Sequence, residues 1–216
     1  MSENIEKTLR FVKESFEGSP WFAENPAEGM YRLEHTLRVA RIGEKIAEDE
    51  GLDREALIIA CLLHDIAYSN LIPAGGWNEH GRVGAAMARP FLQSLGLEKE
   101  KVEEICYGIA IHVDDAADFE GVRSPLALSV GDADSIDRFG VFRIYDAMRY
   151  AGFYEMKLEE KLEWSVNRVR ALKRLYSIDF ATETAKKLWL ENLEYQIDYF
   201  GRLQQQLEDS RIPEEF

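Results

Sequence analysis

The chain has 216 residues, of which 46% are hydrophobic, so it is long and apolar enough to fold as one domain with a full core. Its formal net charge of −14 argues against binding to nucleic-acid polymers, because that affinity comes mainly from Lys and Arg side chains. The longest apolar run, residues 56–63, is far shorter than the roughly 20 residues that span a bilayer. With no targeting pattern at the N-terminus either, we expect a cytoplasmic protein without a membrane partner.

Helical periodicity recurs along the chain, without the sustained alternation that is typical of strands. The pattern predicts helices over residues 3–16, 30–50, 53–67, 79–95, 98–113, 125–138, 141–151, 155–176 and 180–208. Gly51 suits the end of the second helix, Asp53 caps the third, and Ser124 caps the sixth. We therefore expect an all-α fold. The irregular segment 68–78 lies where a loop covering a site would follow the third helix.

The four histidines of the chain all lie on inward faces or at inward ends of predicted helices. His35, His80 and His112 share helical faces with apolar residues, and His64 ends a helix that is apolar on every side. Asp65 follows directly, and a buried carboxylate is costly unless a cation neutralises it. Any one of these residues is more often a hydrogen-bonded core side chain, and an arginine would satisfy Asp65. Their conjunction favours a metal site.

The kinds of ligand in this set indicate which metals would bind. Imidazoles together with carboxylates suit Fe, Mn, Zn, Co or Ni better than Mg, which prefers oxygen ligands. One or two divalent ions are expected. Hydrolysis by water that the metal activates is the chemistry that such a site supports.

Three segments resemble the motifs of the His-Asp, or HD, phosphohydrolase superfamily. They are His-Thr-Leu-Arg-Val (35–39), Leu-Leu-His-Asp-Ile-Ala (62–67) and Gly-Asp-Ala-Asp-Ser-Ile-Asp (131–137). The resemblance spans about residues 30–145 and implies a single HD-type helical domain over 1–216, with the C-terminal helices of 153–208 packing on the motif core. It also implies a metal-binding set with Asp65 as the bridging, catalytic carboxylate. Its first metal is held by His35, His64, Asp65 and Asp134, and its second by His80 and His112.

Two assignments stay open at this point. Asp132, Asp134 and Asp137 lie close together in the sequence, and the Ala-Asp pair of the family motif favours Asp134 as the distal ligand. Related sequences often carry a basic residue at the position of Ser135. The substrate's phosphate is therefore expected to bind another cation, with Arg38 chosen ahead of Arg138 and Arg143.

The resulting hypothesis is a metal-dependent phosphohydrolase that cleaves a small phosphate ester, such as a nucleotide, by metal-activated water. One alternative is a catalytically silent domain that binds metal or nucleotide in signalling, and another is a di-iron oxygenase with an HD fold. Aromatic residues recur at helical spacing in the C-terminal third, and we interpret most of them as core. A homodimer surface there is the alternative reading. These residues are Trp164, Tyr176, Trp189, Tyr195, Tyr199 and Phe200.

Overall fold

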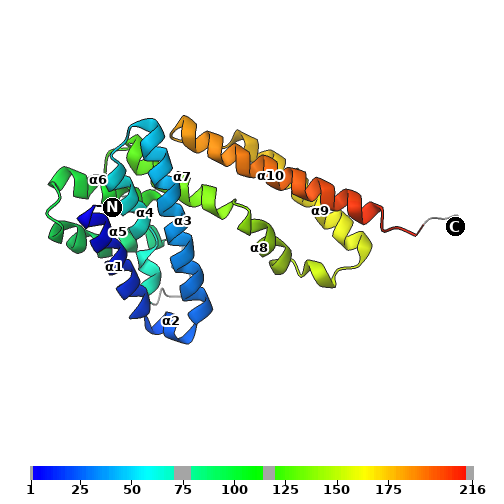
Figure 1. Cartoon of the computed structure of the whole chain (residues 1–216), viewed down its shortest axis with the longest axis horizontal. Coiled ribbons are helices and arrows are strands. Elements are labelled where there is room, and N and C mark those ends of the chain that lie inside the picture. Colours follow the sequence, from blue (N-terminus) through cyan, green and yellow to red (C-terminus); the bar gives the residue numbers. More distant parts are fainter. Residues whose placement is uncertain (1, 71–78, 114–119, 213–216) are drawn as a thin grey trace. The chain divides into compact units, whose positions relative to one another are not determined.

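The computed structural model describes residues 2–70, 79–113 and 120–212. In these ranges the chain forms ten α-helices and no strand, which confirms the all-α prediction (Figure 1). The α-helices are α1 (Glu3–Glu17), α2 (Pro20–Glu24), α3 (Pro26–Glu50), α4 (Arg54–Leu63), α5 (His80–Ser94), α6 (Lys99–Ile111), α7 (Pro125–Arg138), α8 (Phe142–Tyr150), α9 (Leu158–Lys173) and α10 (Glu183–Glu208). Short 3₁₀ helices are η1 (Ile66–Ser69), η3 (Phe153–Glu155) and η4 (Arg174–Ser177). None of the helices in the described ranges is both long and apolar enough to cross a bilayer.

The contacts divide the chain into two compact units. The first comprises Met1–Asp137 and Phe180–Ala185, and the second comprises Arg138–Asp179 and Lys186–Phe216. The predicted packing of the C-terminal helices on the motif core stays a prediction, as does the single domain over 1–216. Residues 71–78 of the expected loop lie outside the described residues.

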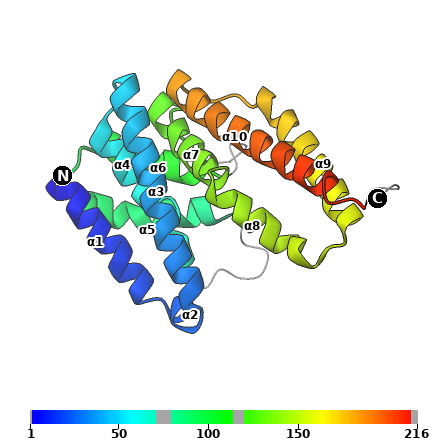
Figure 2. The ribbon, with the colours of Figure 1, turned by 45° about the vertical axis from the view of Figure 1, so that its right-hand side comes forward.

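Helix α4 packs against α1, α3 and α6 in the first unit. Figure 2 shows it beside α3 and α6. Every residue from Ala56 to Leu63 is buried, as the apolar pattern predicted. Fully burying a Leu or Ile side chain contributes about 1.5–3 kcal/mol, so this helix has a fixed place in the core. Its C-terminal end therefore carries His64 and Asp65 into the interior.

The predicted helix boundaries agree best where a capping residue marks them. Gly51 adopts the left-handed conformation with φ of 67° at the end of α3, and the Asp53 carboxylate accepts a hydrogen bond from the N–H of Ala56 at 3.0 Å. The Ser124 hydroxyl caps α7 by accepting from the N–H of Ala127 at 3.1 Å. Local side-chain chemistry therefore sets these ends.

Other boundaries were predicted wrongly. The helix expected over 53–67 ends at Leu63, and Asp65, with φ of −104° and ψ of 15°, leaves the α-helical region before η1 begins. Helix α3 begins at Pro26 rather than at residue 30, with the proline in its first turn. Helix α2 was not predicted, because five residues are too few to show a period. The Ser19 hydroxyl, which accepts from the N–H of Phe22, holds its start.

A close approach of α5 to α6 fixes the position of His80, the first residue of α5. A Cβ atom on Gly81 would lie 2.6 Å from the Ala110 carbonyl oxygen and 2.9 Å from that of Ile109. We predict that Gly81→Ala destabilises the protein by about 1–3 kcal/mol, because backbone atoms cannot yield and α5 must move away. Urea unfolding measures the change.

The matched control for Gly81 is Gly201, inside α10, where a Cβ atom would meet nothing within 4 Å. Gly201→Ala should raise stability by up to about 1 kcal/mol, since alanine is the better helix former. Equal behaviour of the two variants would contradict the proposed close contact at Gly81.

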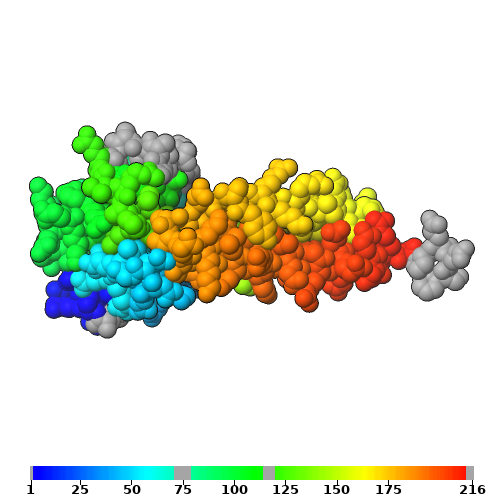
Figure 3. Space-filling view, turned by 90° about the horizontal axis from the view of Figure 1, so that it is seen from above, coloured from blue at the N-terminus to red at the C-terminus, as the bar shows by residue number. Residues whose placement is uncertain are grey.

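In the second unit, α9 and α10 lie along each other (Figures 1 and 3). Their core contains Leu172, Leu193 and Phe200, and the Trp164 ring lies edge-on to that of Phe200 at 5.5 Å. Trp189 and Phe200 are buried, as expected of core residues, and Tyr199 and Trp164 are partly buried. Tyr176 and Tyr195 keep 42% and 51% of their surface exposed. A dimer surface in the C-terminal third stays a prediction.

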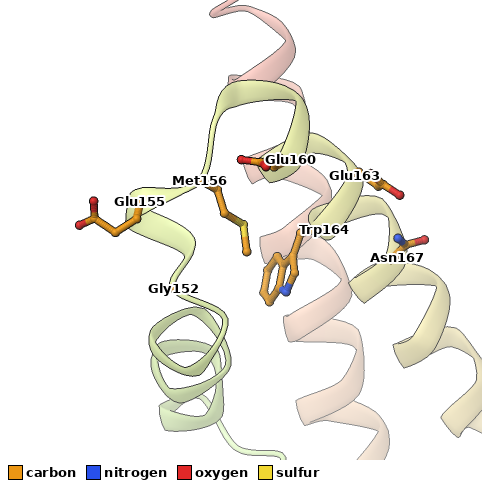
Figure 4. Close-up of a pocket in the computed structure, with 7 residues that line it drawn as sticks. All are labelled: Gly152, Glu155, Met156, Glu160, Glu163, Trp164 and Asn167. Atoms are coloured by element: carbon orange, nitrogen blue, oxygen red, sulfur yellow. The ribbon is translucent and has the colours of Figure 1, made fainter.

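A hollow of about 480 Å³ opens beside η3 and α9 in the second unit (Figure 4). Its lining residues are Gly152, Glu155, Met156, Glu160, Glu163, Trp164 and Asn167. In the close-up, the side chains of Met156 and Trp164 approach each other, whereas the Glu155 carboxylate points away. Among the described residues that line it there are three glutamates and no cation, so it does not suit a phosphate ester.

Candidate metal centre

The structure brings together the six side chains that the sequence proposed as metal ligands. They are His35 of α3, His64 and Asp65 beyond the end of α4, His80 at the start of α5, His112 beyond the end of α6, and Asp134 of α7. Asp65 lies between the other members: its Oδ2 faces His35 and His64, and its Oδ1 faces His80 and His112. Its two oxygens therefore belong to two neighbouring clusters.

The first cluster contains His35, His64, Asp65 and Asp134. The Nε2 atom of His35 lies 3.1 Å from Oδ1 of Asp134 and 3.6 Å from Oδ2 of Asp65. The Nε2 atom of His64 lies 3.3 Å from both His35 Nε2 and Asp65 Oδ2. When a tetrahedral metal has ligand bonds of about 2.0–2.2 Å, its neighbouring ligand atoms are about as far apart as the nitrogen and oxygen atoms of this cluster. This cluster has the spacing of a transition-metal site.

The second cluster contains His80, His112 and the other oxygen of Asp65. The Nε2 atoms of the two histidines are 3.1 Å apart, and they lie 3.4 Å and 3.7 Å from Asp65 Oδ1. The His35 and His64 side chains are 2% and 0% exposed, whereas that of His80 keeps 11%. Solvent therefore reaches His80 more readily than it reaches His35 or His64.

Hydrogen bonds on the far side of three imidazoles fix their orientation. The Nδ1–H of His64 donates to the Cys61 carbonyl at 2.7 Å, and the Nδ1–H of His112 donates to the Ile109 carbonyl at the same distance. The Nδ1–H of His35 donates to the Asp137 carboxylate at 2.7 Å. These bonds direct each Nε2 atom at the carboxylates, the arrangement that metal-binding histidines use.

The chemistry of the donor atoms tests whether a cation fits. His64 and His112 use Nδ1–H for a backbone carbonyl, so each imidazole, in the neutral form that binds metals, offers Nε2 as an acceptor. Each acceptor nitrogen then faces an acceptor oxygen of Asp65, at 3.3 Å and 3.7 Å. Facing lone pairs repel unless a positive charge lies between them. The residues therefore fit divalent transition metals, and the ligand atoms of two groups lie within 4.8 Å of one another: His35, His64 and Asp134, and His64, Asp65 and His112.

The pKa values of the carboxylates keep them in the ionised form that can bind a metal. Burial would raise the pKa of Asp65, but the charge of His64 and hydrogen bonds with the surrounding histidines hold this pKa well below its usual range. Burial likewise opposes ionisation of Asp134 and Asp137, yet their contacts with His35 keep both pKa values low. All three are ionised at neutral pH. Burial would lower the pKa of His35, but hydrogen bonds with Asp134 and Asp137 raise it to about 9.

Each of these carboxylates also lies against a cationic group of the protein. Arg32 donates through Nη1 to Asp65 Oδ2 at 2.6 Å. Protonated His35 lies against Asp134. Arg38 donates twice to Asp137, at 2.7 Å and 3.1 Å. A metal ion at the first cluster would therefore replace the Nε2 proton of His35 and compete with Arg32 for Asp65.

The three candidate distal aspartates have different surroundings. Asp134 points its carboxylate into the first cluster, whereas Asp137 orients His35 from behind and pairs with Arg38. Asp132 accepts from the N–H of Ala181 at 2.9 Å, and its burial raises its pKa to about 6. This placement favours Asp134 as the ligand, in keeping with the Ala-Asp motif.

Sequence reasoning did not identify Arg32, which contacts the central carboxylate. Arg32 lies one helical turn before His35 on α3, so its spacing of three residues was the available signal. Arg38, which was chosen instead, has its guanidinium on Asp137, and its role toward the substrate stays a prediction. The Arg38 side chain is 39% exposed, so it lies at the protein surface.

A cavity of about 860 Å³ lies beside the first cluster. It is lined by apolar residues of α1, α3 and α4, with Arg38, Arg41, Glu44, Arg54 and Asp137. Asp137 bonds Nδ1 of His35, the nitrogen opposite to the one that faces the cluster. The cavity therefore adjoins the supports of the site rather than its ligand atoms.

Residues 32–138 match the family model described as "HD domain". The matched segment begins at Arg32 and ends just after Asp137, so it contains all six side chains of the two clusters. Ribonuclease Y of Cutibacterium acnes is 32% identical over 87 residues, which cover 40% of this chain and 14% of that protein. The bifunctional uridylyltransferase/uridylyl-removing enzyme of Phenylobacterium zucineum is 34% identical over 94 residues, which cover 37% and 9%. The chain thus spans a small part of the length of these curated relatives.

Two solved structures resemble nearly the whole chain. A predicted HD superfamily hydrolase from an uncultured Thermotogales bacterium superposes with a TM-score of 0.65 at 24% identity, over 93% of this chain and 91% of that one. An HD-superfamily hydrolase from Bacillus thuringiensis gives a TM-score of 0.66 at 22% identity, over 97% and 98%. At these identities the likeness shows a shared fold. With the matched segment and its histidine and aspartate clusters, the chain belongs to the HD superfamily.

Proposed function

We propose that the protein is a metal-dependent phosphohydrolase that cleaves a small phosphate ester, with a nucleotide or a related compound as substrate. His35, His64, Asp65 and Asp134 would hold one divalent ion, and His80 and His112 would hold a second with Asp65. The observation that carries the proposal is Asp65, whose two oxygens face two separate pairs of imidazoles. Fe, Mn, Zn, Co and Ni all suit this set.

A divalent ion bound here would supply a Lewis acid that activates water and neutralises charge on the phosphoryl oxygens. The protein's own groups set up that chemistry. Asp137 and the carbonyls of Cys61 and Ile109 orient three imidazoles, so little reorganisation is needed. The ionised Asp65 would hold both ions, since its Oδ2 faces His35 and His64 and its Oδ1 faces His80 and His112. The water oxygen bonds to phosphorus as the bond from phosphorus to the leaving ester oxygen breaks, and a proton released by the water goes to that oxygen.

The substrate class follows from charge and from the relatives. A chain with a net charge of −14 favours a small ester over a nucleic-acid polymer, because a polymer needs an extended cationic surface. The names of the relatives describe a ribonuclease and a uridylyl-removing enzyme, and both names refer to nucleotide chemistry. We propose a small nucleotide-like substrate, with neither membrane nor polymer as partner.

Metal analysis and anaerobic turnover test this function. The protein, purified without chelator, should contain a transition metal and release phosphate or a nucleotide product from a panel of nucleotides and generic phosphate esters without oxygen. Chelation should stop turnover, and Mn should restore it. A need for oxygen would instead favour a di-iron oxygenase. Bound metal without turnover of any ester would favour a silent metal- or nucleotide-binding domain.

A further inference from the structure

Arg32 combines an ion pair with the central carboxylate and an aromatic platform. Its Nη1 donates to Asp65 Oδ2 at 2.6 Å, and its guanidinium carbon lies 3.8 Å from the centre of the Tyr68 ring. The side chain is 15% exposed, so the arginine lies at the border between the buried clusters and solvent. Stacking on tyrosine fixes the plane of the guanidinium group.

One donor of this arginine has no acceptor among the described residues. Its Nε atom is buried there without a hydrogen-bond partner. Its Nη2 atom reaches Glu28, an exposed side chain, at 3.3 Å. A buried N–H without an acceptor is uncommon in folded proteins, and an anionic ligand is one means of satisfying it. Phosphate fits a guanidinium especially well, because two parallel N–H groups can bind two of its oxygens.

Arg32 and a divalent cation are alternative counter-ions for Asp65. The carboxylate that pairs with Arg32 also faces His35 and His64 in the first cluster. A cation bound there would take much of the negative charge of Asp65 and would repel the guanidinium group. An anion that touches both the cation and Arg32 removes this repulsion. A phosphoryl group of a substrate has the required charge and oxygen atoms.

We propose that Arg32, held on Tyr68, is the substrate-binding arginine that contacts the phosphoryl oxygens. Asp65 keeps it in place until a metal ion takes over that carboxylate. The inference rests on the proposed function and replaces Arg38 in the substrate role. The two arginines differ in their partners: Arg38 gives two hydrogen bonds to Asp137, which supports His35, whereas Arg32 pairs with the carboxylate that the metals need.

The first measurement uses inorganic phosphate as the probe. Calorimetric titration of the Mn-loaded full chain should show phosphate binding, and Arg32→Met should weaken it at least about tenfold, the loss of one charged hydrogen bond. The exposed Arg41→Met is the control and should change the phosphate affinity less than threefold. Arg38→Met tests the competing candidate and should lose less affinity than Arg32→Met. Unchanged phosphate affinity in Arg32→Met, or no phosphate binding by the native Mn-loaded protein, overturns the proposal. A tenfold loss in Arg38→Met alone returns the role to Arg38.

The second measurement, Mn binding to protein stripped with chelator, does not depend on catalysis. Arg32→Met should bind Mn more tightly, by about tenfold, because the competing counter-ion of Asp65 is gone. A merely structural arginine predicts the opposite, since losing it would disorder Asp65 and lower Mn affinity, and that result overturns the proposal. If Arg32→Met does not fold, Tyr68→Leu keeps the charge and removes the platform, and it should weaken phosphate binding several-fold. Unchanged phosphate affinity in Tyr68→Leu also counts against the proposal.

Failure of this inference can be distinguished from failure of the proposed function. Ester hydrolysis by the native protein with equal phosphate affinity in Arg32→Met rejects the arginine and keeps the hydrolase. If phosphate and Mn affinities change in Arg32→Met as expected, but the native protein hydrolyses no ester, the anion site at Arg32 is supported and the hydrolase function is rejected.

Discussion

Asp65→Ala is expected to lose metal from both clusters and to abolish hydrolysis, because Asp65 is the one carboxylate that faces both pairs of imidazoles among the described residues. The structure adds a cost in stability. The change leaves Arg32, 15% exposed, without its 2.6 Å partner, and breaking a buried ion pair in this way costs about 3–5 kcal/mol. Metal content and thermal unfolding of the chelator-treated protein measure the two effects separately.

Asp65→Asn separates the metal effect from the structural one. Its amide oxygen can still accept from Arg32, so the variant should unfold closer to the native temperature while losing most of its metal. Asp132→Asn is the matched control, since Asp132 is a partly buried aspartate two residues before Asp134 and accepts from the Ala181 N–H. It should keep its metal. Native metal content in Asp65→Ala would reject the whole ligand assignment.

Helical periodicity and capping chemistry made the fold predictable. Each histidine of the proposed set shares a face with buried residues or follows an apolar helix, so the pattern predicted which side chains point inward. The packing of α4 between α1, α3 and α6 then explains why His64 and Asp65 reach the core. Helix ends with sharp local signals, such as the start of α7 after Ser124, were placed to within a residue.

The features that sequence reasoning missed depend on contacts between distant segments. Arg32 meets Asp65 across 33 positions, and Asp137 meets His35 across 102, and neither separation leaves a trace in local periodicity. The break at His64 was missed because the apolar run continues into Ile66 and Ala67, both buried. Only the backbone turn at Asp65 shows that the helix has ended.

Single histidine replacements should divide the site into two halves. His35→Ala removes a ligand that lies 3.1 Å from Asp134 and 3.3 Å from His64, so the first ion should be lost and hydrolysis with it. His80→Ala and His112→Ala remove ligands that lie 3.1 Å from each other and face only Oδ1 of Asp65, so each should lower the stoichiometry from two ions to one. Elemental analysis after equilibrium dialysis against Mn counts the ions.

The two replacements in the second cluster also differ from each other in a way that tests the geometry. His112 is anchored by the Ile109 carbonyl and has a 1% exposed side chain, whereas His80 begins a helix and keeps 11%. His112→Ala should therefore cost more stability, by about 1–3 kcal/mol, because it empties a buried position and leaves that carbonyl without its donor. His80→Ala should lower the number of bound ions with little change in the free energy of unfolding. A native protein that holds one ion, and keeps it in both variants, would leave His80 and His112 as supporting side chains of a mononuclear hydrolase.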